Sequence, residues 1–508
     1  MSKAIHKTKN GIQYVYESTS YWDKKKKAPR TRQKYLGKLD PETGKLIPKR
    51  EVPEQPEDFK PKVQTVGPYL LFEKLAETTG LASTLKRAFP AEWQEVLTLS
   101  YFICHQGHAF SHCESWSKDH KIPSDMNFTS QNISRMMGKI TDESREKFLK
   151  LWGERFSEKE MLCYDITSVS SYAKAMDYVR YGYNRDHEPL PQINLAMLYS
   201  QNSRLPVYYR YLPGCIADVS TLKQTEKLLN YADLVRLCFI MDMGFYSKEN
   251  LDDLYRNQYR FLMGVPTSRK WINDIIEANW TTLNSAENYH PDKDNPFAAM
   301  TVLTKYNGHR CYVHIYCNPA KKNNADISFM NGLLEYKSRR ENGLSEKTQD
   351  EFYEKFLVVK ETEKRGLSVR FDDKAIAKYR ARHVGVFVLI SNFEKDALKA
   401  LDTYRNKDVV EKCFDDLKSE EDCNRLRMHS DHLAQVKMFL CFLALILRSE
   451  LANKIRNSKE LNVLGVPRIL QEMNTMREVT VEHRYRHAIT EPTRIQQMIL
   501  DVMGIQTE

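Results

Sequence analysis

The sequence predicts a mixed α/β fold, and three observations lead to that prediction. Between residues 161 and 265, five β-rich apolar runs follow one another, and helical patterns precede the fourth and the fifth. The 508 residues are 41% hydrophobic and 28% charged, which is typical of a globular chain long enough for several domains. The longest wholly apolar run, residues 438–447, is too short to span a membrane, so we expect a cytoplasmic chain with no membrane partner.

The first 155 residues precede this region and change character once. Residues 1–60 contain the short β-rich runs GIQYVYES and RQKYLGKLD and predict a strand-rich arm. Residues 61–155 have helical apolar spacing in PYLLFEKLAETTGLASTLKRAF and SREKFLKLW. Between these helices, TSQNISRMMGKI predicts a short amphipathic helix that either contacts DNA through Arg135 and Lys139 or, more commonly for such a pattern, only packs.

The five runs of the central region define the expected core. They are MLCYDITS, QINLAMLYS, LPVYYRYLPG, LCFIMDMG and YRFLMGVP, with helices expected at STLKQTEKLLNYADL and SKENLDDLYR. Three strands, a helix, a strand, a helix and a strand is the order of a ribonuclease H-like core, whose first part we assign to residues 156–265.

Residues 266–380 interrupt this pattern, and we expect a largely β insertion domain there. Asn307 and Gly308 separate two β-rich runs, which is a strong hairpin signal, and charged helices are expected over 326–340 and 350–363. The core pattern resumes over 381–450 with the strand VGVFVLISN and one helix from about Asp396 past Lys418. Residues 451–508 predict a helical C-terminal region, and HLAQVKMFLCFLALILRSEL before it predicts a buried core helix.

The net charge of +10 is concentrated in the N-terminal arm. Residues 1–50 hold 14 Lys and Arg against 4 Asp and Glu, a difference that equals the excess of the whole chain. Cations interleaved with aromatic rings suit a polyanion such as DNA, although a merely solvated basic arm is an equal alternative for a charge run alone. The candidate DNA-binding cations are Lys24, Lys25, Lys26, Lys27, Arg30 and Arg32.

Two aspartates lie where strands seldom carry them. Asp165 is inside the apolar run MLCYDIT, and Asp242 ends LCFIMD. Each alone could serve a local turn, and that is the more common role of a single strand-end aspartate. Together, at the ends of adjacent strands, they can form one crevice that binds a divalent cation.

A helical wheel over 404–418 adds a third carboxylate. At about 100° per residue, one narrow face holds Tyr404, Lys407, Glu411 and Lys418, and the opposite face is apolar. For such a stripe taken alone, a solvated face with intrahelical ion pairs is by far the more common explanation.

The spacing of these four residues resembles the Y(2)R(3)E(6)K signature of DDE transposases of the insertion sequence 4 superfamily, with Lys407 in place of Arg. Asp242-Met243-Gly244-Phe245 resembles the second aspartate motif of that superfamily, and YDITS resembles its first. The likeness covers most of the chain and is strongest to the insertion sequence 1634 branch.

This resemblance implies that Asp165, Asp242 and Glu411 are the catalytic residues and the metal ligands. It implies that Tyr404, Lys407 and Lys418 contact the phosphates of the transposon end, with Arg405 able to substitute for the missing Arg. Two Mg²⁺ ions about 4 Å apart, or Mn²⁺ in their place, would assist an in-line displacement.

The function implied is cleavage of double-stranded DNA at terminal inverted repeats, followed by strand transfer into target DNA, as a cut-and-paste reaction with a hairpin intermediate. A homodimer on DNA in the bacterial cytoplasm, associated with the nucleoid, is expected. Two alternatives stay open: a catalytically inert DNA-binding protein derived from a transposase, and a structure-specific nuclease.

Other chemistry has weaker support in the sequence. The cluster Cys104, His105, His108, His112 and Cys113 matches no standard zinc spacing. The ten cysteines show no paired pattern, so we expect reduced, buried thiols.

Overall fold

The computed structural model describes residues 2–506 except 10, 24–26, 50–60, 108, 157–159, 174, 218–219, 222–237, 292–295, 343–349, 363–365, 381–384, 422–424 and 482–485. Its contacts divide the chain into two units, Met1–Lys62 with Thr480–His487, and Val63–Val479 with Ala488–Glu508. Lys24, Lys25 and Lys26 and most of the helix expected over 220–234 lie outside the described residues.

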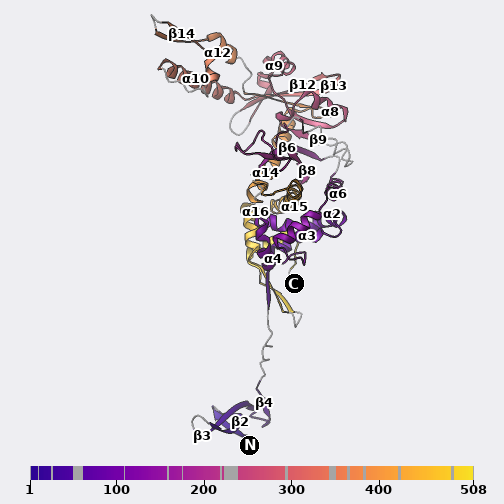
Figure 1. Ribbon diagram of the computed structural model, residues 1–508, viewed down its shortest axis with the longest axis vertical. Coiled ribbons are helices and arrows are strands. Elements are labelled where there is room, and N and C mark those ends of the chain that lie inside the picture. The colour runs from indigo at the N-terminus through magenta and orange to yellow at the C-terminus, as the bar shows by residue number, and fades with distance from the viewer. Residues whose placement is uncertain are drawn as a thin grey trace. The chain divides into compact units, whose positions relative to one another are not determined.

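The N-terminal unit contains an antiparallel sheet in the order β1-β2-β3-β4 (Figure 1). Aromatic rings from its two long strands pack together, with the Tyr35 ring centroid 6.0 Å from that of Tyr14 and 5.2 Å from that of Tyr16. The strands are β1 (Ser2–Lys9), β2 (Ile12–Asp23), β3 (Ala28–Leu39) and β4 (Leu46–Pro48). The β-rich pattern of this segment therefore corresponds to strands that build a small sheet of their own.

The larger unit begins with helices. Residues 61–155 form a short strand and six α-helices whose apolar faces are buried, in agreement with the helical spacing of the sequence. They are β5 (Lys62–Thr65), α1 (Gly67–Thr78), α2 (Leu81–Ala88), α3 (Trp93–Gln106), α4 (Cys113–Asp119), α5 (Ser130–Lys139) and α6 (Asp142–Gly153), with the short turn η1 (Phe110–His112).

The main sheet has nine strands in the order β11-β12-β13-β16-β10-β9-β6-β7-β8. The five expected core strands form one half of it, and β6 is antiparallel to β7 but parallel to β9. These strands are β6 (Met161–Ser170), β7 (Gln192–Ser200), β8 (Pro206–Pro213), β9 (Cys238–Met241) and β10 (Arg260–Gly264), with η2 (Met243–Phe245) and α8 (Lys248–Arg256) between the last two.

Three strands of the other half come from the region expected to be an insertion, and the fourth, β16, is the strand with which the core pattern was expected to resume. Asn307 and Gly308 both have positive φ, 46° and 84°, and make the tight turn that the sequence indicated. The resulting hairpin pairs through β13 with β16, and β16 pairs with β10, so the hairpin extends the core sheet and does not form a separate one. The elements are α9 (Lys270–Leu283), η3 (Ala286–Asn288), β11 (Tyr289–His290), β12 (Phe297–Tyr306), β13 (His309–Cys317) and β16 (Val386–Ser391).

The expectation of a largely β insertion needs a correction, because helices account for much of residues 266–380. A second small core in this region is formed by Phe329, Leu333, Tyr336, Phe356, Leu357 and Val369. The helix expected over 350–363 stops after one turn, because Leu357 begins a strand whose apolar residues pack on this core. The elements are α10 (Pro319–Glu341), α11 (Asp350–Glu354), β14 (Leu357–Thr362), β15 (Gly366–Phe371) and α12 (Asp373–Arg380).

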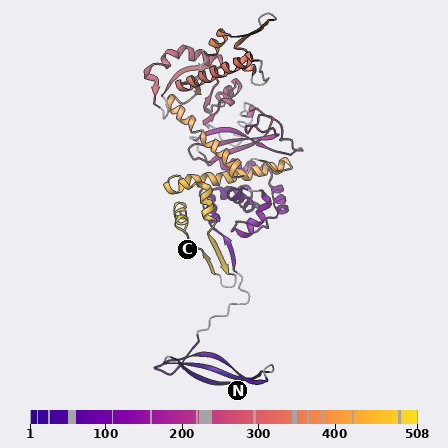
Figure 2. The same cartoon turned by 90° about the vertical axis from the view of Figure 1, so that its left-hand side faces the viewer.

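The predicted core helix is α15 (Asp431–Ile455), which lies between the sheet strand β8 and the helices α1 and α3 (Figure 2). Among the described residues it is the one helix with the length and apolar composition of a membrane span, and 78% of its most apolar window is buried inside the protein. The chain ends with α16 (Lys459–Met473), β17 (Arg477–Val481), β18 (Arg486–Ile489) and α17 (Arg494–Met503). Nine described cysteines form no disulfide, and all except Cys215 are buried.

Candidate active site

Two parallel strands place the first two candidate carboxylates side by side. In the β6–β9 pair, Tyr164 lies opposite Met241. Asp165 and Asp242 are the next residues of the two strands, so they occupy neighbouring positions at the same end of the pair, where adjacent strands are about 4.8 Å apart. Asp242 is the first residue after β9 and directly precedes η2.

Glu411 comes from a helix that packs over the same strands. It belongs to α14 (Asp408–Asp415), whose Cys413 Sγ lies 3.4 Å from Met197 Sδ on β7. The prediction of a single helix from Asp396 past Lys418 is wrong. Helix α13 (Ala397–Arg405) ends before a turn at 406–407, and α14 begins after this turn and continues into the π-helix η4 (Asp416–Glu420). Because a π-helix bonds each residue to the fifth along, it rotates Lys418 away from the position given by an α-helical wheel.

Lys407 joins the carboxylates. Its Nζ lies 2.8 Å from Glu411 Oε1 and 3.4 Å from Asp242 Oδ2, and its side chain is 6% exposed. Burial alone would lower the pKa of Lys407, but the Asp165, Glu411 and Asp242 carboxylates raise it above its ordinary value, so the ammonium stays charged. Lys407 was predicted to contact a DNA phosphate from a polar helix face. In the structure its ammonium instead lies beside the carboxylates of Asp242 and Glu411.

Tyr404 fixes the orientation of Asp242. The phenol hydroxyl donates a short hydrogen bond to Asp242 Oδ1. Burial and the adjacent Asp242 carboxylate both raise the pKa of Tyr404, so the hydroxyl remains protonated as a donor. Tyr404 thus orients the carboxylate of Asp242, the residue that follows β9.

Asp165 is the most enclosed of the three carboxylates. Burial raises its pKa to about 6, although the ammonium of Lys407 and a hydrogen bond from the backbone N–H of Ile166 act in the opposite direction. The Arg185 guanidinium also lowers the pKa of Asp165, which places Arg185 near the site. At neutral pH Asp165 is ionised in this electrostatic setting.

The loop that carries Arg185 was missed by sequence analysis as a source of site residues. The side chain of Asn184 anchors it, because its Nδ2 donates to Ser170 Oγ at 3.1 Å and its Oδ1 accepts from the N–H of Asp186 at 2.8 Å. Lys418 Nζ lies 2.7 Å from both Asp186 carboxylate oxygens. The sequence signal for this loop was Asn184 in a turn-rich segment ahead of the buried strand β7.

The remaining candidates lie elsewhere. The guanidinium of Arg405 is 5.8 Å from the ring centroid of Phe297, next to β12. In the N-terminal unit, Arg32 is exposed on β3, and Arg30 forms a 3.6 Å ion pair with Asp23 at 48% side-chain exposure. Lys27 has a φ of 46° in the turn between β2 and β3.

The helical candidates lie on the α-helices that precede the sheet. In α5, Ile133, Met136 and Met137 are buried while Arg135 and Lys139 are exposed. In the cysteine and histidine cluster, His105 Nδ1 accepts a hydrogen bond from Trp116 Nε1 at 3.0 Å.

His105 provides a test of acid stability. Burial lowers its pKa to about 3, and the nearby His120 acts in the same direction. In the unfolded chain this histidine takes up a proton near pH 6.5, whereas in the folded chain it stays neutral down to about pH 3. The free energy of unfolding should therefore fall as the pH drops from 6.5 towards 3. This one group contributes at most about 1.4 kcal/mol per pH unit. Urea unfolding at pH 7 and pH 5 should show a smaller pH effect in His105→Gln than in the wild type, and the exposed His112→Gln should keep the wild-type effect. Equal pH effects in all three proteins would contradict the assignment.

The chemistry of the site suits a hard divalent cation, because three carboxylates supply the oxygen ligands that Mg²⁺ and Mn²⁺ prefer. The carboxylates surround the Lys407 ammonium in this conformation, and in the described part of the chain no three His, Cys, Asp or Glu side chains are arranged as a metal site. The donor chemistry fits a metal ion, and binding one would require the Lys407 ammonium to move away from the carboxylates.

Comparisons with known proteins give one family match and a similar solved structure. Residues 157–447, more than half of the chain, match the family model described as a transposase DDE domain. A search of curated proteins finds no match. A solved structure of a piggyBac transposase synaptic complex with hairpin DNA is similar at 10% identity, covering 79% of this chain and 70% of that chain with a TM-score of 0.39.

Proposed function

Because this chain belongs to the family of transposases with a DDE domain, we propose that Asp165, Asp242 and Glu411 are its catalytic residues and that it cuts DNA at the ends of a mobile element. The observation that carries the proposal is the convergence of these three side chains on Lys407 from β6, the end of β9 and α14. All three residues lie within the segment that matches the family.

The proposed core is ribonuclease H-like. The strand order β8-β7-β6-β9-β10 supports this, since the first three strands are antiparallel neighbours and the last two are parallel to β6. The paired residues of β6 and β9 end at Tyr164 and Met241, and the two aspartates are the next residues of the chain after this last pair.

The proposed cofactor is Mg²⁺, two ions in the full reaction, with Mn²⁺ able to replace it. When bound, the metal would lower the energy of the attacking and leaving oxygens of an in-line displacement. Asp165, Asp242 and Glu411 would hold it. Tyr404 keeps Asp242 turned towards the site by its hydrogen bond, and burial of Asp165 on β6 limits the access of bulk water.

The basic side chains of this site then have defined roles towards DNA. Lys407, once displaced from the carboxylates, would pair with a strand phosphate next to the cut. Arg185 would approach the same strand from the loop after β6, and Lys418 would be released to DNA only if its pair with Asp186 opens. We propose the phosphate contacts of Tyr404, Lys407 and Lys418 on this basis.

The proposed reaction continues from cleavage to strand transfer. Water would cut at the terminal inverted repeat, and the freed 3′ hydroxyl would attack the opposite strand or target DNA at the same carboxylates. A cut-and-paste course with a hairpin on the element's end, and a homodimer that holds two ends together, belong to this proposal.

The decisive experiment is cleavage of labelled DNA that carries the gene's own flanking ends, with Mg²⁺, Mn²⁺ or EDTA. We expect cuts at the element boundary with either metal and none with EDTA. Cuts at branched DNA without regard to the element's ends would favour a structure-specific nuclease. Binding without cleavage in either metal would leave an inert DNA-binding protein and overturn the proposal.

The N-terminal sheet is the proposed second DNA contact. Arg30 and Arg32 lie on β3 with the exposed rings of Tyr21 and Trp22 on the neighbouring strand β2, which combines cations with stacking surfaces. Each phosphate contact contributes about 0.9 to the slope of log affinity against log salt.

A charge-removal variant tests this contact. The double variant Arg30→Gln, Arg32→Gln should lower the magnitude of that slope by up to about 2 and weaken binding more at low salt than at high salt. Fluorescence anisotropy with labelled duplex DNA over a salt series measures both quantities. A matched variant, Lys459→Gln with Arg494→Gln, removes two exposed cations from the C-terminal helices and should change neither, whereas equal effects of the two variants would contradict a specific contact by the arm.

A further inference from the structure

A buried arginine of the core helix α15 binds both ends of the π-helix η4. Arg448 is 4% exposed and comes directly after the apolar residues 438–447. Its Nε lies 3.0 Å from Asp416 Oδ1 and its Nη2 lies 3.1 Å from Glu420 Oε2, and these carboxylates belong to the first and last residues of η4. Burial would lower the pKa of Arg448, but the Asp416 and Glu420 carboxylates raise it above its ordinary value, so the guanidinium stays charged. One planar group therefore joins α15 to both ends of the π-helix.

The π-helical turn itself needs an explanation, because π-helices are rare and are frequently found at functional sites. The N–H of Glu421 donates to the carbonyl of Asp416 at 3.1 Å, which is the bond between a residue and the fifth along that defines this turn. On the side of α3, the chain approaches so closely that a Cβ at Gly107 would overlap the carbonyl oxygen of Glu420. Two neighbouring helices, α3 and α15, thus contact the last residue of the turn.

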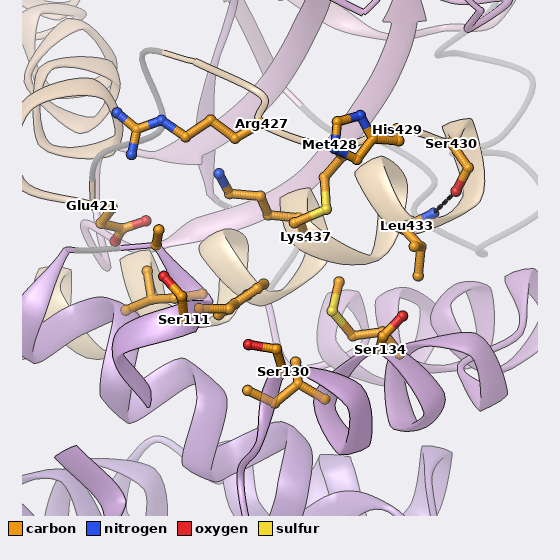
Figure 3. Close-up of a pocket in the computed structure, with 15 residues that line it drawn as sticks. Ser111, Ser130, Ser134, Glu421, Arg427, Met428, His429, Ser430, Leu433 and Lys437 are labelled. Carbon is orange, nitrogen blue, oxygen red and sulfur yellow. Dashed lines mark hydrogen bonds between the residues drawn. The ribbon is translucent and has the colours of Figure 1, made fainter. Parts of the chain in front are cut away.

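Beside this end of η4 lies open space. Glu421 lines a cavity of about 580 Å³, and Figure 3 shows this cavity with Ser130 and Ser134 of α5 on the wall opposite Lys437 of α15. Protein interiors are normally close-packed, so a space of this size gives the chain room to move. Packing from the cavity side therefore does not fix the residue that closes the π-helical bond, whereas the ion pair of Arg448 fixes the residue before it.

The π-helix connects the core helix to two parts of the proposed active site. It continues directly from α14, so Asp416 is five residues beyond Glu411, about 7.5 Å along a helix at 1.5 Å per residue. Within η4, Lys418 Nζ lies 2.7 Å from both carboxylate oxygens of Asp186, which belongs to the loop between β6 and β7. Because π-helices and α-helices turn by different angles per residue, a change from one form to the other would displace Glu411 and Lys418 relative to α15.

From these contacts we propose that Arg448 is a positioning residue for DNA cleavage. It holds η4 in the π-helical form and thereby sets where Glu411 and Lys418 lie in the site, without touching DNA itself. The inference rests on the proposed function, since it assigns Arg448 to the reaction of the three carboxylates. A buried ion network that served stability alone could be replaced by neutral groups with little loss, so the two roles give different results.

A neutralised network separates positioning from stability. Arg448→Met alone leaves Asp416 and Glu420 without their cation, and it should lower both the melting temperature and the cleavage of element-end DNA. The triple variant Arg448→Met, Asp416→Asn, Glu420→Gln removes every charge of the network and should recover most of the melting temperature. Its single-turnover cleavage should stay about 100-fold below that of the wild type, because a displacement of about 1 Å in a reacting group costs that much.

Hydrogen exchange reports on the π-helical turn itself. In the triple variant the backbone amides of 416–421 should exchange faster than in the wild type, measured by mass spectrometry of the peptide that contains them. Arg448→Lys gives a second, independent variant, because it keeps the charge at the buried position. One ammonium cannot bind both ends of η4 as a planar fork does, so this variant should fold and cut on the order of tenfold more slowly.

The control replaces another buried arginine that contacts α15. Arg145 is 7% exposed and donates hydrogen bonds to Asp142 and, at 2.9 Å, to Gln435 of α15. The variant Arg145→Met, Asp142→Asn should leave cleavage per folded molecule and the exchange of 416–421 as they are in the wild type.

The inference is overturned if the triple variant or Arg448→Lys cuts at the wild-type rate, or if cleavage falls while the exchange of 416–421 stays that of the wild type. If the triple variant does not fold, Arg448→Lys decides alone. These outcomes leave the proposed function intact, because the wild type still cuts the element's ends. A wild type that does not cut them overturns the proposed function and this inference together.

Discussion

Glu411→Gln should reduce cleavage of element-end DNA by about 1000-fold or more, because a ligand of the proposed metal site would lose its charge. The amide of Gln is the same size as the carboxylate and its oxygen can still accept the hydrogen bond from Lys407. The Glu411 side chain is 56% exposed, so the substitution should leave the fold and its thermal stability nearly unchanged. DNA binding measured in Ca²⁺ should also persist.

The matched control for Glu411→Gln is Asp408→Asn. Asp408 is exposed on the same helix, and its replacement removes one negative charge without touching the carboxylate group. Single-turnover assays with a labelled end should show wild-type cleavage by Asp408→Asn and almost none by Glu411→Gln. A Glu411→Gln protein that cuts at the wild-type rate would remove Glu411 from the catalytic residues and leave the three-carboxylate proposal without its helix.

Much of the core was predictable from the sequence because it rests on local patterns. Short β-rich apolar runs indicated β6, β7, β8, β9 and β10, and the rarity of aspartate in strands drew attention to Asp165 and Asp242. The hairpin at Asn307 was equally clear from its turn residues, which tolerate positive φ. In each case the signal and the structure involve the same few residues.

The features that could not be predicted depend on distant parts of the chain. The pairing of β13 with β16 joins the presumed insertion to the core sheet, and no local pattern specifies which distant strand another strand pairs with. Lys407 was expected on a polar surface, because the helical wheel could not include Asp242 from another element. The pair between Lys418 and Asp186 likewise needed the π-helix and the loop after β6 in place.

Lys407→Met should destabilise the protein in metal-free buffer and make it more responsive to Mg²⁺ than the wild type. The Lys407 ammonium is the buried cation between Asp242 and Glu411, and it also lowers the pKa of Asp165. Without it the three carboxylates repel one another at neutral pH. Breaking a fully buried pair costs about 3–5 kcal/mol, and since the Asp242 and Glu411 side chains are 47% and 56% exposed, we expect a smaller loss of about 1–2 kcal/mol.

Magnesium should reverse this loss, because a cation that binds only the folded state stabilises it by RT ln(1 + c/Kd), where c is the free cation concentration, and this quantity increases as the cation binds more tightly. In the wild type Mg²⁺ must displace the ammonium, and in Lys407→Met that competition is gone. Thermal unfolding with 0 and 10 mM Mg²⁺ should therefore show a larger metal-induced rise in melting temperature for Lys407→Met than for the wild type, and a wild-type rise for Lys412→Met, an exposed lysine of the same helix. The same small rise in all three proteins would mean that the ammonium does not compete with the metal, and Lys407 would then be a structural partner of the carboxylates only.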